Sequence, residues 1–583
     1  MNILLTTLNA KYIHSSLALL TLRQACREQI LSPIRVEEYT INHSLLDIVS
    51  DIFAARPDVI ALACYIWNWE MTKDLVSLLQ KVLPEAKIIL GGPEVSYDPK
   101  VIFAECAEAD FVISGEGENA LPALLQKLEE RASNFSAIPG VTAREDAISA
   151  QPVAVADLDA LRFPYEPGDM EPLKEKIIYY ESSRGCPFSC QYCLSSASQG
   201  VRYRSLEKVL AEIDFFVANK VRQVKFVDRT FNAFEKHYFP ILQHIKELET
   251  KTNFHFEIAV ELLNDEIIEF LADMPKGRIQ FEIGVQSTHE PTLAAIDRKN
   301  DWQEIVRKVT QLRSYNNMHL HLDLIIGLPF EDKKTFGRSF NHLYALQPHM
   351  LQLGFLKMLR GAKIHSHAIE HHYIWMDQAP YEVLANDVLP YEDVRQLKIF
   401  EEVFELYYNK GRFQATLTYM TLLAGDAFTF YENFSQWWEQ QGFHKISHST
   451  KQLYQHLLDY GRLYYEEKTL LLVQLLKFDA LTNDQGKIRQ EGLDWNERRF
   501  DKEITAFWRS EKAEQYVADF SFQTWRTLQK EFHIEVFTAA VKDFVTTGQL
   551  ITRPTAYLFD YRQKDVLCCE IACEDFWLEE TRL

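Results

Sequence analysis

Short apolar strands alternate with amphipathic helical patterns over the first 131 residues of the chain. The apolar runs predict strands at residues 2–7, 35–41, 59–66, 87–90 and 109–114. Helical periodicity predicts helices between and after them, at residues 17–28, 45–55, 71–82, 101–107 and 120–130. Such alternation predicts an α/β fold with a parallel, doubly wound, Rossmann-like sheet, which binds ligands beyond the carboxyl ends of its strands.

Four loops follow the carboxyl ends of these predicted strands. They cover residues 7–14, 65–70, 91–96 and 115–118. Two of them begin with glycine, at Gly91 and Gly115, and a residue without a Cβ atom lets the backbone approach a ligand closely. The sequence therefore predicts a ligand site along this edge of the sheet.

A second alternation follows a proline-rich segment at residues 132–175, which we interpret as a connection. Strands are predicted at residues 176–181, 223–228, 255–261, 278–285, 319–326 and 351–359. Helices are predicted at residues 206–217, 238–248, 265–274, 302–314 and 334–346. Six βα units of this kind predict a partial (βα)6 TIM-like barrel with its active site at the carboxyl ends of the strands.

From about residue 380 the pattern becomes mainly helical and aromatic, for example at residues 394–408 and 453–478. Near the end, residues 555–561 and 565–571 predict a β-hairpin. The predicted domains are a Rossmann-like domain at 1–135, a connecting segment at 136–175, a partial barrel at 176–375 and a mainly helical accessory domain at 376–583.

Composition limits the partners of this chain. The 583 residues carry a formal net charge of −21, and binding to nucleic acid or anionic membranes depends on clustered Lys and Arg. No apolar run is long enough to span a bilayer, and the N-terminus lacks the pattern of a signal peptide. We therefore expect a cytoplasmic protein that uses neither nucleic acid nor a membrane as a partner.

Three of the nine cysteines form a dense group, Cys186, Cys190 and Cys193. Thiolates are soft ligands for zinc or iron–sulfur clusters, and this spacing lets one loop place three sulfurs around one centre. A zinc loop would need a fourth Cys or His, and the nearest histidines are His43 and His237. A thioredoxin-like Cys-x-x-Cys does not suit a loop after the first barrel strand. Three ligands are one short of the usual four for a cluster, which leaves one iron open for catalysis.

The segment Cys186-Pro-Phe-Ser-Cys190-Gln-Tyr192-Cys193 resembles the signature of the radical S-adenosylmethionine (SAM) superfamily. The resemblance implies that the three cysteines hold a catalytic 4Fe–4S cluster whose open iron binds SAM. It also implies that the reduced cluster passes one electron to the sulfonium of SAM, which breaks into methionine and an adenosyl radical. An external one-electron donor of the flavodoxin or ferredoxin type would supply that electron.

Further motifs at successive barrel strands resemble the SAM-binding positions of this superfamily. The matching segments are Phe226–Phe231, Ala259–Glu261, Glu282–Ser287 and Asp323–Pro329. The residues to which the resemblance assigns contact with SAM are Tyr192, Asp228, Glu261, Gln286, Asp323, Gly327 and Pro329.

An α/β domain directly before such a barrel resembles the cobalamin (vitamin B12)-binding subgroup of the superfamily. The resemblance assigns contact with cobalamin to Asn9, His14, Tyr65, Trp67, Gly91, Gly92, Gly115 and Glu116. The Asp-x-His-x-x-Gly signature that supplies a histidine to cobalt elsewhere is absent, since the residues here read Tyr12-x-His14-x-x-Leu17. A lone histidine near a helix start is also a common cap or surface residue.

These features together predict a cobalamin-dependent radical SAM enzyme that methylates or rearranges a small molecule. One alternative is a tRNA methylthiotransferase, which has another cysteine trio in its N-terminal domain and a basic C-terminal domain; here Cys26, Cys64 and Cys106 are dispersed and the chain is acidic. A second alternative is a cobalamin-binding sensor or carrier, which would not need a complete cysteine trio.

The C-terminal third resembles an accessory domain of unknown function. Its cysteines, Cys568, Cys569 and Cys573, fall in or next to a predicted strand, where adjacent side chains face opposite ways. We interpret them as small buried hydrophobes rather than ligands of a second cluster.

Overall fold

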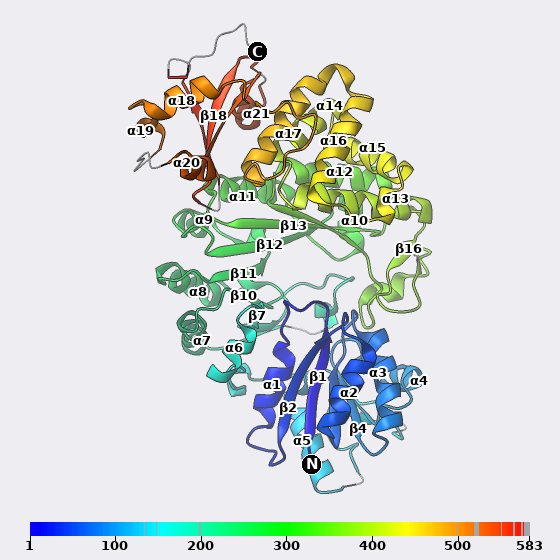
Figure 1. Cartoon of the computed structure of the whole chain (residues 1–583). Helices are drawn as coiled ribbons and strands as arrows, with labels where there is room; N and C mark the ends of the chain where they lie inside the picture. Colours follow the sequence, from blue (N-terminus) through cyan, green and yellow to red (C-terminus); the bar gives the residue numbers. More distant parts are fainter. Residues whose placement is uncertain are drawn as a thin grey trace. The chain divides into compact units, whose positions relative to one another are not determined.

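The computed structural model of the chain contains two compact units, residues Met1–Val394 and Arg395–Leu583 (Figure 1). The structure describes residues 1–132, 134–146, 148–197, 200–496, 498–517, 524–549, 551–563, 566–572 and 575–576. Among the described residues, no helix combines the length and the apolar character needed to cross a bilayer.

The first unit begins with a six-stranded sheet in the order β2-β1-β3-β4-β5-β6. Its strands are β1 (Ile3–Asn9), β2 (Ile34–Thr40), β3 (Val59–Ala63), β4 (Lys87–Gly91), β5 (Phe111–Ile113) and β6 (Val141–Ala143). The first five are parallel and match the prediction, whereas β6 pairs antiparallel with β5. The segment interpreted as a pure connection therefore supplies an edge strand, which its prolines concealed.

Helices cover both faces of this sheet (Figure 1). They are α1 (Leu17–Cys26), α2 (Leu45–Ala55), α3 (Trp69–Val82), α4 (Pro99–Glu105) and α5 (Gly117–Glu129). Apolar side chains of α2, α3 and α4 form one core cluster against the sheet, and those of α1 and α5 form the other. Because β3 and β5 are buried along their whole length, they read as continuous apolar runs, as expected for a parallel sheet covered on both sides; β1 is equally buried but also contains Thr6, Thr7 and Asn9.

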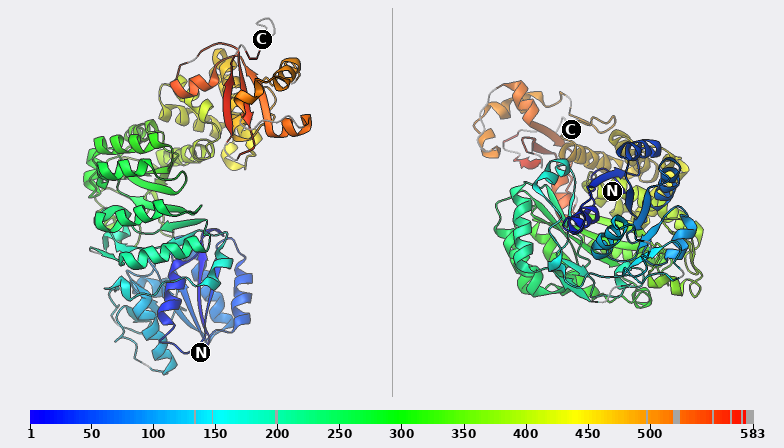
Figure 2. Two further views of the ribbon diagram at one scale, coloured as in Figure 1. Left: turned by 90° about the vertical axis from the view of Figure 1, so that its left-hand side faces the viewer. Right: turned by 90° about the horizontal axis from the view of Figure 1, so that it is seen from below.

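A second parallel sheet follows in the order β14-β13-β12-β11-β10-β7, with β7 and β14 at its edges. Its strands are β7 (Ile178–Tyr180), β10 (Gln223–Phe226), β11 (Asn253–Ile258), β12 (Ile279–Gln286), β13 (His319–Ile326) and β14 (Met350–Phe355). The connecting helices are α7 (Leu206–Ala218), α8 (Glu235–Glu247), α9 (Asp265–Ala272), α11 (Trp302–Tyr315) and α12 (Lys333–Ala345), and Figure 2 shows them stacked along one face. This open sheet confirms the predicted fold class of a partial (βα)6 barrel.

The second unit is mainly helical, as predicted. It contains the end of α13 (Tyr391–Phe404), followed by α14 (Gln414–Ala424), α15 (Ala427–Gln440), α16 (Thr450–Tyr464) and α17 (Thr469–Asn483). The predicted helical stretch at 453–478 is divided by a short 3-10 turn at Glu466–Lys468.

The predicted hairpin is present as β18 (Thr555–Asp560) and β19 (Leu567–Ile571). The prediction missed a third antiparallel strand, β17 (Phe532–Phe537), on the other side of β18. Cys568 and Cys569 lie in β19, and Cys569 packs against the hydrophobic core of this sheet. Cys573 lies outside the described residues, so the interpretation of this group stays a prediction.

Candidate functional site

The cysteine loop, residues 186–195, starts directly after β8 (Ser183–Gly185), which pairs antiparallel with β9 (Val201–Tyr203). Gly185 has φ +101°, and a Cβ atom added there would lie 2.1 Å from the carbonyl oxygen of Gly200. Only glycine permits this conformation and this approach without strain. The two ends of the cysteine-bearing segment are therefore held side by side at the start of the barrel.

Backbone hydrogen bonds connect the loop to later parts of the barrel. The N–H of Gln191 donates to Ile296 O at 3.0 Å, and Gln191 O accepts from the N–H of Ile364 at 3.0 Å. A backbone N–H also points at one sulfur, since Ser195 N donates to Cys193 Sγ at 3.4 Å. The loop is thus positioned by its main chain, which leaves the thiols to face the cavity beside them.

The three thiols differ in their surroundings. Cys190 is buried, and burial raises its pKa despite the neighbouring Arg298 guanidinium, whereas Cys186 and Cys193 are half-buried. Across the described part of the chain, Glu282, His321 and Asp323 form the one group of three His, Cys, Asp or Glu side chains with all ligand atoms within 4.8 Å. Cys186, Cys190 and Cys193 are not part of that group, and all three line a cavity next to the loop.

The thiols line a cavity of about 170 Å³ at the carboxyl ends of β10 to β13. Of the residues predicted to contact SAM, Tyr192, Gln286 and Asp323 line it. Gln286 has φ +72°, which is strained for a residue with a side chain, and it lies at a register shift between β12 and β13. Its Nε2 atom lies 2.3 Å from where a Cβ of Gly284 would be, so the missing side chain at Gly284 makes room for this amide.

Arg298 was not identified from the sequence, although it lines the same cavity. Its Nη1 atom donates to Tyr192 Oη at 3.2 Å and lies 3.7 Å from Cys190 Sγ. A guanidinium at this place favours the thiolate form of a cysteine and stabilises negative charge on sulfur. No strand-end motif marks Arg298, because it lies in a loop after the short helix α10 (Glu290–Ala295).

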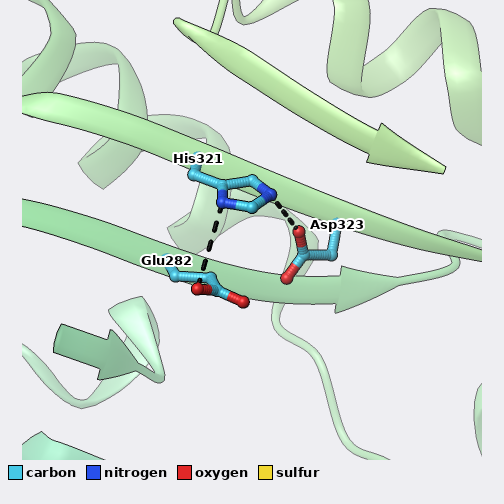
Figure 3. Close-up of side chains that lie close together, drawn as sticks. All are labelled: Glu282, His321 and Asp323. Atoms are coloured by element: carbon cyan, nitrogen blue, oxygen red, sulfur yellow. Dashed lines mark ion pairs between the residues drawn. The ribbon is translucent and has the colours of Figure 1, made fainter. Parts of the chain in front are cut away.

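Glu282 and Asp323 line this cavity and, together with His321, belong to a charged network (Figure 3). Glu282 Oε2 accepts hydrogen bonds from Lys225 Nζ at 2.9 Å and His255 Nε2 at 2.8 Å, and His321 Nε2 lies 2.7 Å from Asp323 Oδ1. Burial opposes ionisation of Glu282, but His255 and Lys225 hold its pKa below the usual range. Because the Lys225 ammonium and the His255 imidazole already contact Glu282, and His321 contacts Asp323, we interpret the group as a hydrogen-bonded ion-pair network rather than a site for a cation.

Four other predicted SAM contacts do not line the cavity. Asp228 is 1% exposed and accepts hydrogen bonds from Ser182 N at 3.0 Å and Ser182 Oγ at 2.7 Å. Glu261 falls in a short helix, Val260–Leu262, because β11 ends at Ile258 and not at residue 261 as predicted; Glu257, inside β11, lines the cavity instead.

Gly327 and Pro329 lie in the turn after β13. The carbonyl of Gly327 accepts from Tyr373 Oη at 2.8 Å, and that of Pro329 accepts from Thr292 Oγ1 at 2.7 Å. Direct contact of Asp228, Glu261, Gly327 and Pro329 with SAM stays a prediction.

A larger cavity, of about 550 Å³, lies between the N-terminal sheet and the start of the barrel. All residues predicted to contact cobalamin line it, namely Asn9, His14, Tyr65, Trp67, Gly91, Gly92, Gly115 and Glu116. Tyr65 and Trp67 stack with ring centroids 4.4 Å apart and an interplanar angle of 6°, which creates a flat aromatic surface. Such a volume and such an apolar, aromatic lining are typical of cofactor cavities.

Several of these residues also have structural partners. Gly92 and Gly115 have φ +108° and +88°, and added Cβ atoms would collide with the backbones of Cys64 and Val153. Close packing of chain on chain therefore explains these two glycines without a ligand. His14 Nδ1 lies 2.6 Å from Tyr179 Oη of β7, and burial lowers the pKa of His14, so its ring is neutral near pH 7.

One residue lines both cavities. Arg229, which follows β10, belongs to the lining of the thiol cavity and to that of the larger cavity. The two cavities therefore adjoin at the carboxyl end of the second barrel strand, where the sequence motif had drawn attention to Asp228 instead.

Comparisons with known families agree with this arrangement. The family models for the B12 binding domain, the radical SAM superfamily and a protein family of unknown function, DUF4080, match residues 3–125, 180–343 and 369–559. The chain therefore carries a radical SAM domain, preceded by a B12 binding domain. A C-terminal domain of unknown function follows these two domains, and the cofactors are a 4Fe–4S cluster, SAM and cobalamin.

Similar curated proteins include the 2-(S-pantetheinyl)-carbapenam-3-carboxylate methyltransferase of Streptantibioticus cattleyicolor, 29% identical over 52% of this chain and 48% of that protein. Another is the cobalamin-dependent radical SAM methyltransferase TokK of Streptomyces tokunonensis, 27% identical over 52% of this chain and 47% of that protein. The chain thus spans about half the length of these relatives.

Among solved structures, the radical SAM methyltransferase TsrM of Kitasatospora setae, with cobalamin and a 4Fe–4S cluster bound, is similar in fold. The TM-score is 0.54 at 16% identity, over 63% of this chain and 78% of that chain.

Proposed function

We propose that this protein is a cobalamin-dependent radical SAM enzyme that methylates, or otherwise modifies, an unactivated carbon of a small molecule. The observation that carries the proposal is the pair of adjoining cavities, one lined by Cys186, Cys190 and Cys193 and the other by the flat Tyr65–Trp67 surface. Two of its similar proteins are methyltransferases, which supports methyl transfer as the outcome.

The thiols of Cys186, Cys190 and Cys193 would hold the cluster, and the cavity beside them would take SAM. Gln286 and Asp323 present an amide and a carboxylate to that cavity, which suit the amino and hydroxyl groups of SAM. Burial, together with the charge of Glu282, raises the pKa of Glu257 to about 7, so this wall of the cavity carries a carboxyl group that exchanges a proton near neutrality.

When bound, the reduced cluster supplies the electron that cleaves SAM, and cobalamin supplies a carrier for the methyl group. The residues of the chain orient these groups and keep water away from them. Asp228 positions the end of β7 through Ser182, while Arg298 places positive charge beside Cys190.

The reaction also requires a low-potential one-electron donor, which we propose to be of the flavodoxin or ferredoxin type. Because thiols that hold a cluster must stay reduced, we propose that the protein works in the cytoplasm.

The structure gives a reason to reject the tRNA methylthiotransferase alternative. Such an enzyme needs three N-terminal cysteines at one place, but Cys26 lies in the core on one face of the first sheet, and Cys64 and Cys106 lie in the core on the other face. All three are at most 1% exposed. They are hydrophobic core residues here.

Anaerobic reconstitution with iron, sulfide and hydroxocobalamin, followed by reduction with dithionite and SAM, tests the proposal. We expect a corrin spectrum, a 4Fe–4S EPR signal and 5′-deoxyadenosine or S-adenosylhomocysteine as products. The variant Cys190→Ala should retain the corrin and lose the cluster and both products, whereas Cys106→Ala serves as a control outside the loop. Wild-type protein that binds corrin but yields neither product would favour the sensor or carrier alternative.

A further inference from the structure

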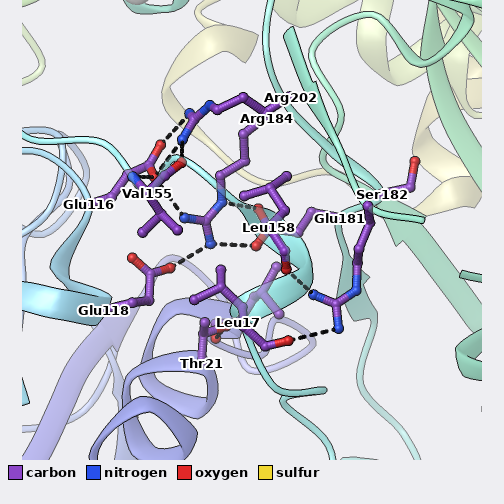
Figure 4. Close-up of polar contacts among 12 residues, drawn as sticks. Leu17, Thr21, Glu116, Glu118, Val155, Leu158, Glu181, Ser182, Arg184 and Arg202 are labelled. Atoms are coloured by element: carbon purple, nitrogen blue, oxygen red, sulfur yellow. Dashed lines mark hydrogen bonds and ion pairs between the residues drawn. The ribbon is translucent and has the colours of Figure 1, made fainter. Parts of the chain in front are cut away.

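Two arginines lie directly opposite each other at the base of the cysteine loop. Arg184 of β8 pairs with Arg202 of β9, and Arg184 precedes Cys186 by two residues. Figure 4 shows both guanidinium groups directed at Glu116 of the N-terminal domain. Glu116 precedes α5, the helix that follows the last parallel strand of the first sheet.

The carboxylate of Glu116 is fully engaged by these contacts. Its Oε1 atom accepts from Arg202 Nη2 at 2.6 Å. Its Oε2 atom accepts from Arg184 Nη1 at 3.1 Å, Arg202 Nη1 at 3.0 Å and the backbone N–H of Val155 at 2.7 Å. Four donors on two oxygens leave little capacity to accept hydrogen bonds from a corrin amide, although Glu116 lines the larger cavity.

Arg184 joins this carboxylate to two others. Its Nε atom donates to Glu181 Oε2 at 2.9 Å, and its Nη2 atom donates to Glu118. The side chains of Arg184 and Glu118 are 14% and 7% exposed, so water screens these ion pairs only weakly. Burial by itself would raise the pKa of Glu116, but Arg202 and Arg184 hold it below the usual range, so the carboxylate stays ionised.

The segment interpreted from the sequence as a connection completes the contact. Glu116 N donates to Val153 O at 2.8 Å, and Arg202 Nη1 also donates to the carbonyl of Val155. Residues 153–155 are therefore held between the strand end of the N-terminal sheet and the β8–β9 hairpin. Glu116, Arg184, Arg202 and the segment 153–155 thus connect the wall of the larger cavity to the two strands that flank the cysteine loop.

We propose that Glu116 is a positioning residue that holds the base of the cysteine loop, and that through Arg184 and Arg202 it couples occupancy of the cobalamin cavity to the geometry of the cluster site. The inference rests on the proposed function for the identity of the two cofactors. It differs from the sequence-based expectation, in which Glu116 contacts cobalamin itself. A ligand in the larger cavity packs against Glu116, Glu118, Glu181 and Arg184, and therefore restricts the hairpin from which Cys186 extends.

The variant Glu116→Gln tests this coupling, because an amide keeps the size of the side chain but loses the charge and one acceptor. Glu212→Gln is the matched control: Glu212 accepts from Arg204 Nη2 at 2.6 Å in a still more buried ion pair that contains no residue of the N-terminal domain. Hydrogen exchange of residues 183–186 and 200–203 is measured first in protein free of iron and corrin. We expect at least tenfold faster exchange in Glu116→Gln and no change there in Glu212→Gln.

The second measurement follows the reconstituted protein with and without hydroxocobalamin. In the wild type, cobalamin should slow exchange of the hairpin and sharpen the EPR signal of the reduced cluster; in Glu116→Gln both responses should be lost while corrin is retained. Unchanged hairpin exchange combined with loss of corrin would overturn the proposal and make Glu116 a direct cobalamin contact. Equal effects of the two variants would also overturn it. A wild type that takes up no cluster would instead count against the proposed function, since the exchange experiment on protein without iron or corrin would still report on the hairpin.

Discussion

The variant Gly185→Ala tests whether close contact at the base of the cysteine loop is needed for cluster binding. Gly185 has φ +101°, and its added Cβ would lie 2.1 Å from Gly200 O and 3.2 Å from Gly200 C. Both atoms belong to the backbone, so no flexible side chain can give way. The positive φ alone costs an L-residue about 1–2 kcal/mol. Relief of the collision requires the end of the β8–β9 hairpin to separate by about 1 Å, which breaks roughly two hydrogen bonds worth about 1 kcal/mol each.

Gly200→Ala is a suitable control for this variant. Gly200 has φ +78°, but a Cβ there would meet no described atom within 4 Å. Both variants therefore carry the backbone strain, but only Gly185→Ala has the collision. Its free energy of closing the loop should be less favourable than that of Gly200→Ala by about 2–3 kcal/mol. Such a difference corresponds to a roughly 30- to 150-fold lower population of the closed loop.

Iron content and the 4Fe–4S absorbance after anaerobic reconstitution provide the assay, with hydrogen exchange of residues 183–186 as a direct measure of hairpin closure. Gly185→Ala should hold less than about a tenth of the wild-type iron, and Gly200→Ala most of it. Full iron content in Gly185→Ala, with unchanged exchange, would show that the loop does not depend on this contact.

Three further predictions concern other parts of the molecule. Trp67→Ala removes one of the two stacked rings of the aromatic surface, the one whose indole donates to Leu8 O at 3.2 Å. It should weaken corrin binding about tenfold without loss of iron. The ratio of corrin to protein after gel filtration measures this effect, and an unchanged ratio would contradict it. Lys477→Met removes the ammonium partner of Glu535 in the second unit, where both side chains are 1% exposed and Glu535 keeps its contacts with His533 and the N–H of Asn496. The variant should cost about 3 kcal/mol in urea unfolding, and a loss below about 1 kcal/mol would contradict it. Burial lowers the pKa of His237 from 6.5 to about 4, so between these values the unfolded chain binds a proton that the folded chain does not, and the free energy of unfolding falls as the pH drops. His237→Gln should therefore reduce the loss of stability between pH 7 and pH 5 by about 2 kcal/mol. An equal loss in variant and wild type would refute this.

Local patterns of the sequence were sufficient for most of the helices and strands. The prediction for α2 matches residues Leu45–Ala55, and that for β13 matches His319–Ile326. The strands that were missed include the edge strands β6 and β17 and the two short strands β8 and β9 of the hairpin beside the cysteine loop. The three residues of β6 are too few to establish a period, and β17 alternates little because five of its six residues are buried.

The positions of side chains at the strand ends required the structure. Glu257 rather than Glu261 faces the thiol cavity because β11 ends three residues before Glu261, which lies in the short helix Val260–Leu262. Gln286 reaches the cavity only because a register shift and a left-handed backbone turn it there. A short sequence motif marks neither a register shift between strands nor a left-handed backbone conformation.

The sequence by itself determined the order of the two α/β domains and the cysteine loop, because hydrophobic periodicity and the spacing of neighbouring thiols are properties of short segments. Only the tertiary structure decided that Arg298 lies beside Cys190 and that Glu116 binds Arg184 and Arg202. These partners are 108, 68 and 86 residues apart along the chain. Charged side chains at such separations meet only after strand order and hairpin pairing have brought their backbones together, so no local pattern specifies which of them will pair.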